Sequence, residues 1–212
     1  MFSALIFDLD GTLVDSAQDI AHAINCTLQD LDLPVKSVAE VKEMVGDGVR
    51  STLTKATGVQ DKEYIEKAAK IFKNHYRKHC VDNTLLYPGV KEMLRYYKNK
   101  KLAVVSNKPY EMILQTLKHC KIEDHFEVVL GPESTANKKP HPEPILVALK
   151  EFKITPKLAL MVGDGTTDME AGRLAGVFTC AVTYGYRKKE DLEKYNPDFF
   201  IDSIEDLKRI VK

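Results

Sequence analysis

Short apolar runs alternate with helical segments over the second half of this 212-residue chain. Pro88-Gly89 opens that part. Strands are expected at residues 102–105, 126–130, 158–162, 178–182 and, with a weaker pattern, 199–201. Helices are expected over residues 90–99, 110–119, 142–152, 168–175 and 204–211. Buried strands alternating with helices of this length predict right-handed βαβ units in a parallel sheet that helices cover on both faces.

One further strand is predicted at the N-terminus. Ala4-Leu5-Ile6-Phe7 is continuously apolar and leads into Asp8, Asp10 and Gly11. Strand residues alternate between faces, so the two carboxylates share a side if the extended form reaches residue 10. Two carboxylates this close repel each other unless a cation or a proton lies between them. The pair is typical of a nucleophile beside an acid/base group with Mg²⁺, although Asp-Gly is also a common turn that closes a strand.

A helical block separates this first strand from the alternating part. Apolar residues recur at helical spacing in four segments between Asp15 and Val81, and no strand pattern interrupts them. Ser16 and Asp19 have capping-box spacing at the start of the first helix. We therefore expect an α/β fold, with a doubly wound parallel sheet built from residues 1–14 and 83–212. A helical insert, residues 15–82, lies between these two parts of the sequence.

Polar side chains directly follow three of the predicted strands. Asp8, Ser106 and Asp164 each come after a buried apolar run. In open parallel sheets, ligands bind beyond the carboxyl ends of the strands. The insert leaves the chain at the same edge, so it is placed to cover these side chains. The sequence predicts a site there.

The overall charge balance argues against some classes of binding partner. The chain has 31 basic and 31 acidic residues, so no global positive field favours nucleic acid or a membrane surface. No apolar run approaches the length of a membrane span. The four cysteines are widely spaced and form no CxxC pair, which is typical of reduced thiols. We expect a cytoplasmic monomer or homodimer that acts on a small molecule.

Four motifs, in order along the chain, carry a resemblance to a known family. They are DLDGTL at residues 8–13, SNK at 106–108, KPHP at 139–142, and GD at 163–164 with Asp168 four residues further on. The chain resembles haloacid dehalogenase-superfamily phosphatases that carry a helical cap after the first motif. Residues 14–16, 45–50 and 183–186 look most like phosphoglycolate phosphatases. The resemblance implies a Rossmann-like core with an α-helical cap domain.

The resemblance also implies roles for the motif residues. Asp8 is expected to attack phosphorus and form an aspartyl-phosphate. Asp10 is expected to protonate the leaving oxygen and then to activate water. The family binds Mg²⁺ through the first aspartate, the backbone carbonyl of the second and an aspartate of the last motif, which here are Asp8, Asp10 and Asp164.

The other motif positions are expected to bind charge and phosphate. Ser106 is expected to donate a hydrogen bond to a phosphoryl oxygen, and Lys139 to neutralise negative charge. Asp168 is expected to orient Lys139 or a metal-bound water. Gly11, Thr12 and Asn107 are expected to bind phosphate or substrate. Taken singly, each such residue also has an ordinary structural role, such as a helix cap, a solvated cation or a helix-start acid.

Three weaker features lie outside this pattern. Arg50, after the Gly46–Gly48 turn, is a candidate to bind a substrate carboxylate, or an exposed arginine at a helix start. His75 and His79 have a spacing that can hold zinc, but a solvated helix face is favoured. Gly165 replaces the serine that many family members carry after the metal-binding aspartate.

The predicted function is a Mg²⁺-dependent phosphomonoester hydrolase for a small anionic phosphorylated metabolite, 2-phosphoglycolate first. A sugar phosphate or pyrophosphate is the alternative substrate. A different class, a receiver-like signalling domain that accepts a phosphoryl group, also places an aspartate at a strand end. Asp10 and the long insert argue against a receiver.

Overall fold

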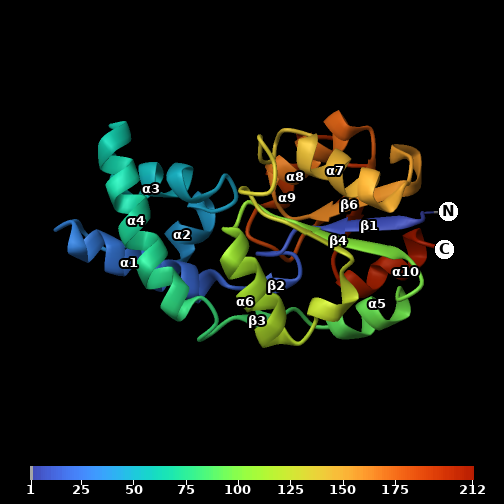
Figure 1. Ribbon diagram of the computed structural model, residues 1–212, viewed down its shortest axis with the longest axis horizontal. Helices are drawn as coiled ribbons and strands as arrows, with labels where there is room; N and C mark the ends of the chain where they lie inside the picture. Colours follow the sequence, from blue (N-terminus) through green and yellow to red (C-terminus); the bar gives the residue numbers. More distant parts are fainter. Residues whose placement is uncertain (1) are drawn as a thin grey trace.

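A six-stranded parallel sheet forms the centre of the larger part of the molecule (Figure 1). The structure is a computed structural model and describes residues 2–212. The strand order is β5-β4-β1-β6-β7-β8, which confirms the predicted doubly wound α/β fold. The strands are β1 (Ala4–Phe7), β4 (Lys101–Val105), β5 (Val128–Leu130), β6 (Ala159–Gly163), β7 (Phe178–Val182) and β8 (Phe199–Ile201).

Helices cover both faces of this sheet because the strands are apolar on both faces. Side chains of β1 alternate, so Leu5 and Phe7 enter the apolar core on one face, whereas Ala4 and Ile6 enter the core on the other. The first core includes residues of α5 (Val90–Tyr96), α6 (Tyr110–Cys120) and α10 (Leu207–Ile210). The second includes residues of α7 (Glu143–Phe152) and α8 (Thr166–Ala175).

The insert folds into four helices with an apolar core of their own. They are α1 (Ala17–Asp30), α2 (Val38–Met44), α3 (Val49–Thr57) and α4 (Lys62–His79). Ile20, Ile24 and Leu28 of α1 share this core with Phe72 of α4. Figure 1 shows these helices at one end of the molecule, and both chain termini at the other end.

The chain crosses between the sheet and the insert on two short antiparallel strands. These are β2 (Val14–Asp15) and β3 (Leu85–Leu86), with Val14 paired to Leu86. No sequence pattern predicts these two strands, because two residues are too few to show a strand period. The pairing holds the outgoing and returning segments side by side.

The capping box expected at Ser16 and Asp19 is wrong. Ser16 lies at the N-cap position of α1 but makes no side-chain cap hydrogen bond, because its hydroxyl donates to Asp10 Oδ1 at 2.5 Å. Asp19 is buried and accepts hydrogen bonds from the backbone and side chain of Asn83 and from Thr84. Both side chains therefore form hydrogen bonds with residues outside α1 and do not cap this helix. A capping box is present at the start of α2, between Ser37 and Glu40.

Several element boundaries also differ from the prediction. The helix expected over residues 90–99 ends at Tyr96, and the strand expected from residue 126 begins at Val128, after a 3₁₀ turn at Glu123–His125. The last helix begins as a 3₁₀ turn, and the short helix α9 (Lys189–Glu193) was not predicted. Within residues 2–212, no helix has the length and apolar character needed to cross a membrane.

Candidate active site

The three predicted strand-end residues lie at adjacent strand ends. β1 pairs with β4 on one side and with β6 on the other, so Asp8, Ser106 and Asp164 follow neighbouring strands. Along the sequence, β4 and β5 are added on one side of β1, and β6, β7 and β8 are then added on its other side. Such a reversal leaves a crevice beyond the carboxyl ends of the strands.

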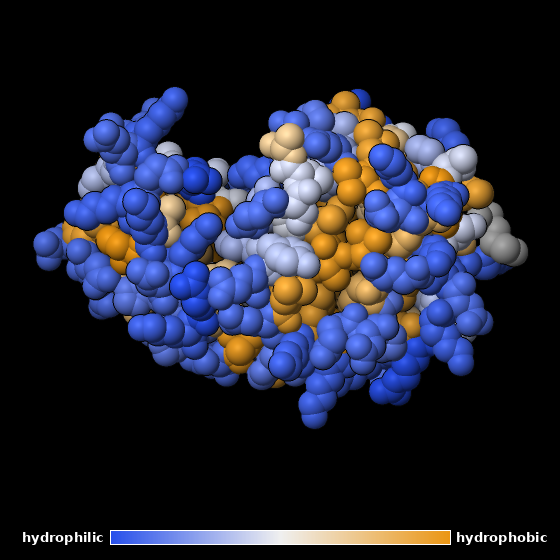
Figure 2. Space-filling model, viewed as in Figure 1, coloured by the Kyte–Doolittle hydropathy of each residue, from blue (hydrophilic) through white to orange (hydrophobic). Residues whose placement is uncertain are grey.

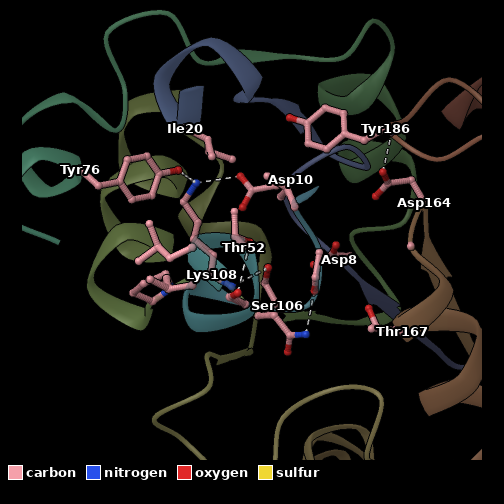
Figure 3. Close-up of a pocket in the computed structure, with 18 of the residues that line it drawn as sticks. Asp8, Asp10, Ile20, Thr52, Tyr76, Ser106, Lys108, Asp164, Thr167 and Tyr186 are labelled. Carbon is pink, nitrogen blue, oxygen red and sulfur yellow. Dashed lines mark hydrogen bonds and ion pairs between the residues drawn. The ribbon is translucent and has the colours of Figure 1, made fainter. Parts of the chain in front are cut away.

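A pocket that is partly open to solvent occupies this position between the sheet and the insert. Asp8, Asp10 and Ser106 line it from the sheet side (Figure 3). Apolar residues of the insert, including Leu53 and Phe72, form the opposite wall. On the outside, the surface is hollowed between the insert and the sheet domain (Figure 2). A small ligand in this cavity would be largely removed from water.

Asp8 lies beside a fully buried ammonium group. Lys139 Nζ is 3.0 Å from Asp8 Oδ1 and 2.5 Å from Asp168 Oδ1, and it also donates to the carbonyl of Val105 at 2.6 Å. Burial acts to lower the pKa of Lys139, but Asp168 and Asp8 outweigh it and hold this pKa above its ordinary value. Lys139 therefore stays charged. Asp168 is its closer carboxylate partner.

Asp164 is held from two sides at the end of β6. Its Oδ1 accepts from the Thr12 hydroxyl at 3.1 Å, and its Oδ2 accepts from the backbone N–H of Tyr186 at 2.7 Å. Gly11 has a φ of +83°, and a Cβ there would lie 2.2 Å from Asp164 Oδ2. Gly11 and Thr12 therefore position this carboxylate and do not line the cavity, where the sequence analysis had placed them as phosphate or substrate ligands.

The acidic cluster has the chemistry of a cation site. Asp8, Asp164 and Asp168 each offer one oxygen, and these oxygens all lie within 4.8 Å of one another. Burial, followed by the charges of Asp8 and Asp168, raises the pKa of Asp164 to about 8. Apart from the Lys139 ammonium at 3.0 Å, no hydrogen-bond partner is found for the buried Oδ1 of Asp8 within residues 2–212. An all-oxygen set of this kind suits a hard divalent cation.

Asp10 occupies a different environment on the same side of the cavity. Its side chain is 10% exposed, and its Oδ1 accepts from Ser16 Oγ at 2.5 Å and from Lys108 Nζ at 2.7 Å. The Asp10 side chain is not part of the acidic cluster. The Asp8 carboxylate therefore belongs to the candidate cation site, whereas the Asp10 carboxylate is held by the Ser16 hydroxyl and the Lys108 ammonium.

The family model described as haloacid dehalogenase-like hydrolase matches residues 5–182, which include Asp8, Asp10, Asp164 and Asp168. The chain belongs to the haloacid dehalogenase-like hydrolase family. The match spans the first strand, the whole insert and the sheet as far as β7, so it covers every residue that builds the cavity's acidic side.

Full-length relatives agree with this assignment. The hydrolase is 35% identical to the phosphoglycolate phosphatase of Colwellia psychrerythraea, with 96% of this chain and 94% of that protein covered. It is 38% identical to the phosphoglycolate phosphatase of Aquifex aeolicus, covering 98% and 95%. A solved structure of a predicted phosphoglycolate phosphatase from Haemophilus somnus matches with a TM-score of 0.93 at 32% identity, covering 100% and 98%.

Ser106 and Asn107 lie on the β4 side of the hydrolase cavity. Both line it and are nearly buried. The Asn107 side-chain amide donates to the carbonyls of Gly46 and Lys139, each at 2.9 Å. Asn107 therefore links the insert, at Gly46, to the backbone of Lys139. This structural role is additional to the expected contact with phosphate or substrate.

Arg50 does not reach the cavity. Its side chain is 68% exposed and forms a bidentate ion pair with Glu66 of α4, and it does not belong to the cavity lining. Because α3 begins at Val49, its first turn carries Arg50 towards α4. His75 and His79 pair with Asp30 and Asp82, respectively, and belong to no potential metal cluster of the described residues.

Two functional residues of the hydrolase were missed, although motifs contained or adjoined them. Lys108, the last residue of the SNK motif, is buried with its ammonium beside Asp10. Tyr186, from the segment at 183–186, donates its backbone N–H to Asp164 Oδ2. Its hydroxyl oxygen accepts from the backbone N–H of Ser16 at 2.9 Å. Spacing could not reveal them, because both act across more than 90 residues of sequence.

The sheet domain also holds one segment of the insert, residues 42–47, which we call the latch segment. Arg187 donates to the carbonyls of Lys42, Glu43 and Val45, and Lys138 donates to that of Asp47. The segment includes the end of α2, where carbonyl groups lack helical partners and attract cations. These contacts hold the insert over the cavity.

Proposed function

We propose that this hydrolase is a Mg²⁺-dependent phosphomonoester hydrolase that acts through an aspartyl-phosphate on Asp8. The observation that carries the proposal is the position of Asp8 at the end of β1. Its carboxylate faces Lys139 Nζ at 3.0 Å, within an acidic cluster and below a covered cavity. Asp10, two residues on, lines the same cavity and supplies the second carboxylate that the reaction needs.

Each residue takes the role that its surroundings allow. Asp8 attacks phosphorus, and the phosphate ester bond breaks as the new bond to the carboxylate forms. Asp10 delivers a proton to the leaving oxygen and later takes one from the attacking water. Lys139 neutralises charge on Asp8 and on the phosphoryl group, while Ser106 donates a hydrogen bond to that group.

Mg²⁺ fits the acidic cluster. Asp8, Asp164 and the Asp10 carbonyl are the proposed ligands, and that carbonyl accepts no backbone hydrogen bond from the described residues. The cation would offset the mutual repulsion of the carboxylates and the charge of the phosphoryl oxygens.

The proposed substrate is 2-phosphoglycolate. Full-length relatives bear the name phosphoglycolate phosphatase, and the insert covers one side of the cavity. Ile20, Leu53 and Phe72 of its wall offer no hydrogen bonds to the hydroxyl groups of a sugar phosphate. A receiver domain has no use for such a covered cavity.

We also infer that residues 15–82 act as a cap over a core of residues 1–14 and 83–212. The insert has its own apolar core, and it joins the sheet domain through the paired strands β2 and β3. Cap closure excludes water from the reacting groups and strengthens the electrostatic interactions around Asp8.

Phosphate release from 2-phosphoglycolate, ethyl phosphate, glucose 6-phosphate, pyrophosphate and p-nitrophenyl phosphate tests the proposal. We expect turnover with Mg²⁺, loss of turnover with a chelator, and the highest kcat/KM for 2-phosphoglycolate. Asp8→Asn should reduce kcat at least about a thousandfold, since an amide is a poor nucleophile.

Asp61→Asn is the matched control. Asp61 is exposed at the N-cap of α4, and asparagine also caps helices well, so this variant should behave like the wild type. Turnover that persists in folded Asp8→Asn would overturn the covalent mechanism. A single labelling of Asp8 without turnover would favour a receiver instead.

A further inference from the structure

Lys108 is a buried cation that the proposed reaction does not yet use. It lies just beyond β4, and its side chain is 1% exposed. Its ammonium donates to Asp10 Oδ1 at 2.7 Å and to Tyr76 Oη at 2.5 Å (Figure 3). Tyr76 belongs to α4 of the insert, so Lys108 bridges the insert and the catalytic loop.

Both partners of this contact retain an unused hydrogen-bond donor. An ammonium group has three N–H bonds, and within residues 2–212 only two acceptors are found for Lys108. Because the Tyr76 oxygen accepts from Lys108, its own O–H remains available, and it donates to no group of the described residues. Burial, followed by the charge of Asp10, raises the pKa of Tyr76 well above its ordinary value, so the hydroxyl keeps its proton.

These two donors face a largely apolar part of the cavity. Lys108 and Tyr76 line it together with Ile20, Leu53 and Phe72. Water is excluded along such a wall, so an anion that meets Lys108 there interacts with it strongly. A buried cation beside unused donors is a site for an anionic group of a ligand.

Other cations near the cavity are already committed. Lys139 is held by Asp8, Asp168 and the Val105 carbonyl. Arg187 binds carbonyl groups of the latch segment, and Arg50 pairs with Glu66 outside the cavity. Among the described residues, Arg187 keeps unused N–H groups but is only partly buried, so Lys108 is the buried lining cation that combines a free donor with a position beside Asp10.

The position of Lys108 matches the chemistry of a phosphorylated 2-hydroxy acid. Asp10 must reach the leaving oxygen in order to protonate it, and Lys108 Nζ lies 2.7 Å from that same carboxylate. In 2-phosphoglycolate a single methylene separates the leaving oxygen from the carboxylate carbon. A carboxylate that close to the leaving oxygen falls beside Lys108.

We propose that Lys108 and Tyr76 form the subsite that binds the substrate carboxylate. The subsite selects phosphate esters in which the carboxylate is one carbon away from the ester oxygen. This role replaces the one expected for Arg50, and it rests on the proposed phosphatase function. Phosphate esters of the same size without the carboxylate lose this contact.

Two matched pairs of probes test the subsite. The substrates 2-phosphoglycolate and ethyl phosphate share a skeleton and differ by the carboxylate. The inhibitors 3-phosphonopropionate and propylphosphonate form the same pair without a cleavable bond, so they report binding apart from chemistry. All four are measured on the wild type, on Lys108→Met, on Tyr76→Phe and on Lys118→Met, an exposed lysine of α6.

In the wild type, we expect 3-phosphonopropionate to inhibit at least about tenfold more strongly than propylphosphonate. Lys108→Met should reduce kcat/KM for 2-phosphoglycolate about ten- to a hundredfold more than for ethyl phosphate, and it should abolish the difference between the inhibitors. Tyr76→Phe should reduce the same two ratios by a smaller factor, and Lys118→Met should leave them unchanged.

The outcomes separate the subsite from the phosphatase function. Equal losses for both substrates, or inhibitor ratios that Lys108→Met does not change, would overturn the subsite. Turnover of p-nitrophenyl phosphate without any preference between the inhibitors would overturn the subsite and leave the phosphatase function standing. Absence of turnover on all phosphate esters would overturn the function instead.

Discussion

Asp8 and Asp10 lie two residues apart, yet their carboxylates have different partners. Asp8 faces Lys139 and the acidic cluster, whereas Asp10 accepts from Ser16 and Lys108. A nucleophile must stay unprotonated, while a group that works as both acid and base must exchange its proton. The proposed function gives the attack to Asp8 and the proton transfer to Asp10.

Asp10→Asn should separate proton donation from nucleophilic attack. The amide keeps an oxygen that can accept from Ser16 and Lys108, but it cannot protonate the leaving oxygen. We expect kcat to fall about 10²- to 10⁴-fold for 2-phosphoglycolate and ethyl phosphate. Aryl phosphates, whose leaving group needs no proton, should lose less in the phosphorylation step, as single-turnover kinetics would show. A uniform loss across all esters would contradict this role.

Gly11→Ala should damage the site through Asp164. The new Cβ would collide with the carboxylate, and the φ of +83° is unfavourable for alanine. We expect the free energy of unfolding to fall by about 3 kcal/mol in urea titrations, with loss of phosphatase activity. Gly58→Ala is the control, because its φ is +73° but no atom lies within 4 Å of the new Cβ. That variant should lose only about 1 kcal/mol and keep its activity.

The sequence predicted several of the residues that belong to this site, but it did not predict which side chains contact one another there. Asp8, Ser106 and Asp164 are marked by their places after apolar runs, and a parallel sheet brings such ends together. The pairing of Lys108 with Asp10 and Tyr76 depends on how the insert sits on the sheet, which no local pattern encodes. Arg50 illustrates the same limit, since Glu66 faces it only after α3 has packed on α4.

At the scale of elements, one buried carboxylate links the two segments that connect the sheet to the insert. Asp19, in the first turn of α1, accepts from Asn83 and Thr84 in the segment that returns to the sheet. Asn83 is exposed but Thr84 is buried, so the Thr84 hydroxyl needs an acceptor that is equally enclosed. The contact fixes the start of α1 beside β3.

Asp19→Ala should therefore destabilise the fold more than the loss of a typical single hydrogen bond would. Its loss leaves the Asn83 and Thr84 donors without a charged acceptor, and we expect about 3 kcal/mol less free energy of unfolding in urea titrations. Glu40→Ala removes an exposed capping-box carboxylate and serves as the control, with an expected loss of about 1 kcal/mol or less. Similar losses in the two variants would show that burial of Asp19 contributes little.

Regular elements were predictable wherever a hydrophobic period was long enough to read. The helices of the insert and the strands β4, β6 and β7 follow such periods closely. The two-residue strands β2 and β3 and the 3₁₀ turns have no period, and they form because neighbouring elements hold them in place.

At the scale of the whole molecule, the latch segment decides how tightly the cavity is covered. Arg187, Lys138 and Asn107 all donate to backbone carbonyls, so the contacts do not depend on which side chains the segment carries. Opening the insert would break them together. Cap opening of this kind often limits substrate entry and product release.

Arg187→Ala should loosen the insert without changing selectivity. We expect faster hydrogen exchange at the amides of residues 45–49, and KM values raised about tenfold for both 2-phosphoglycolate and ethyl phosphate. Arg209→Ala, which removes an 84%-exposed arginine paired with Asp206, is the control and should change neither measurement. A KM change confined to 2-phosphoglycolate would instead place Arg187 among the carboxylate ligands.

The central place of β1 has a consequence for the way the chain is made. Ala4 pairs with Lys101 and with Ala159, so the strand that leaves the ribosome first waits for partners made 97 and 155 residues later. At about 5–20 residues per second, the second partner follows roughly 8–30 s after the strand itself. Four apolar residues that are fully buried in the folded protein lack at least one of their two neighbouring strands for that time. In nascent chains, the apolar residues of β1 therefore wait for both neighbours for much of the synthesis of the sheet, and an unpaired apolar strand of this kind favours aggregation.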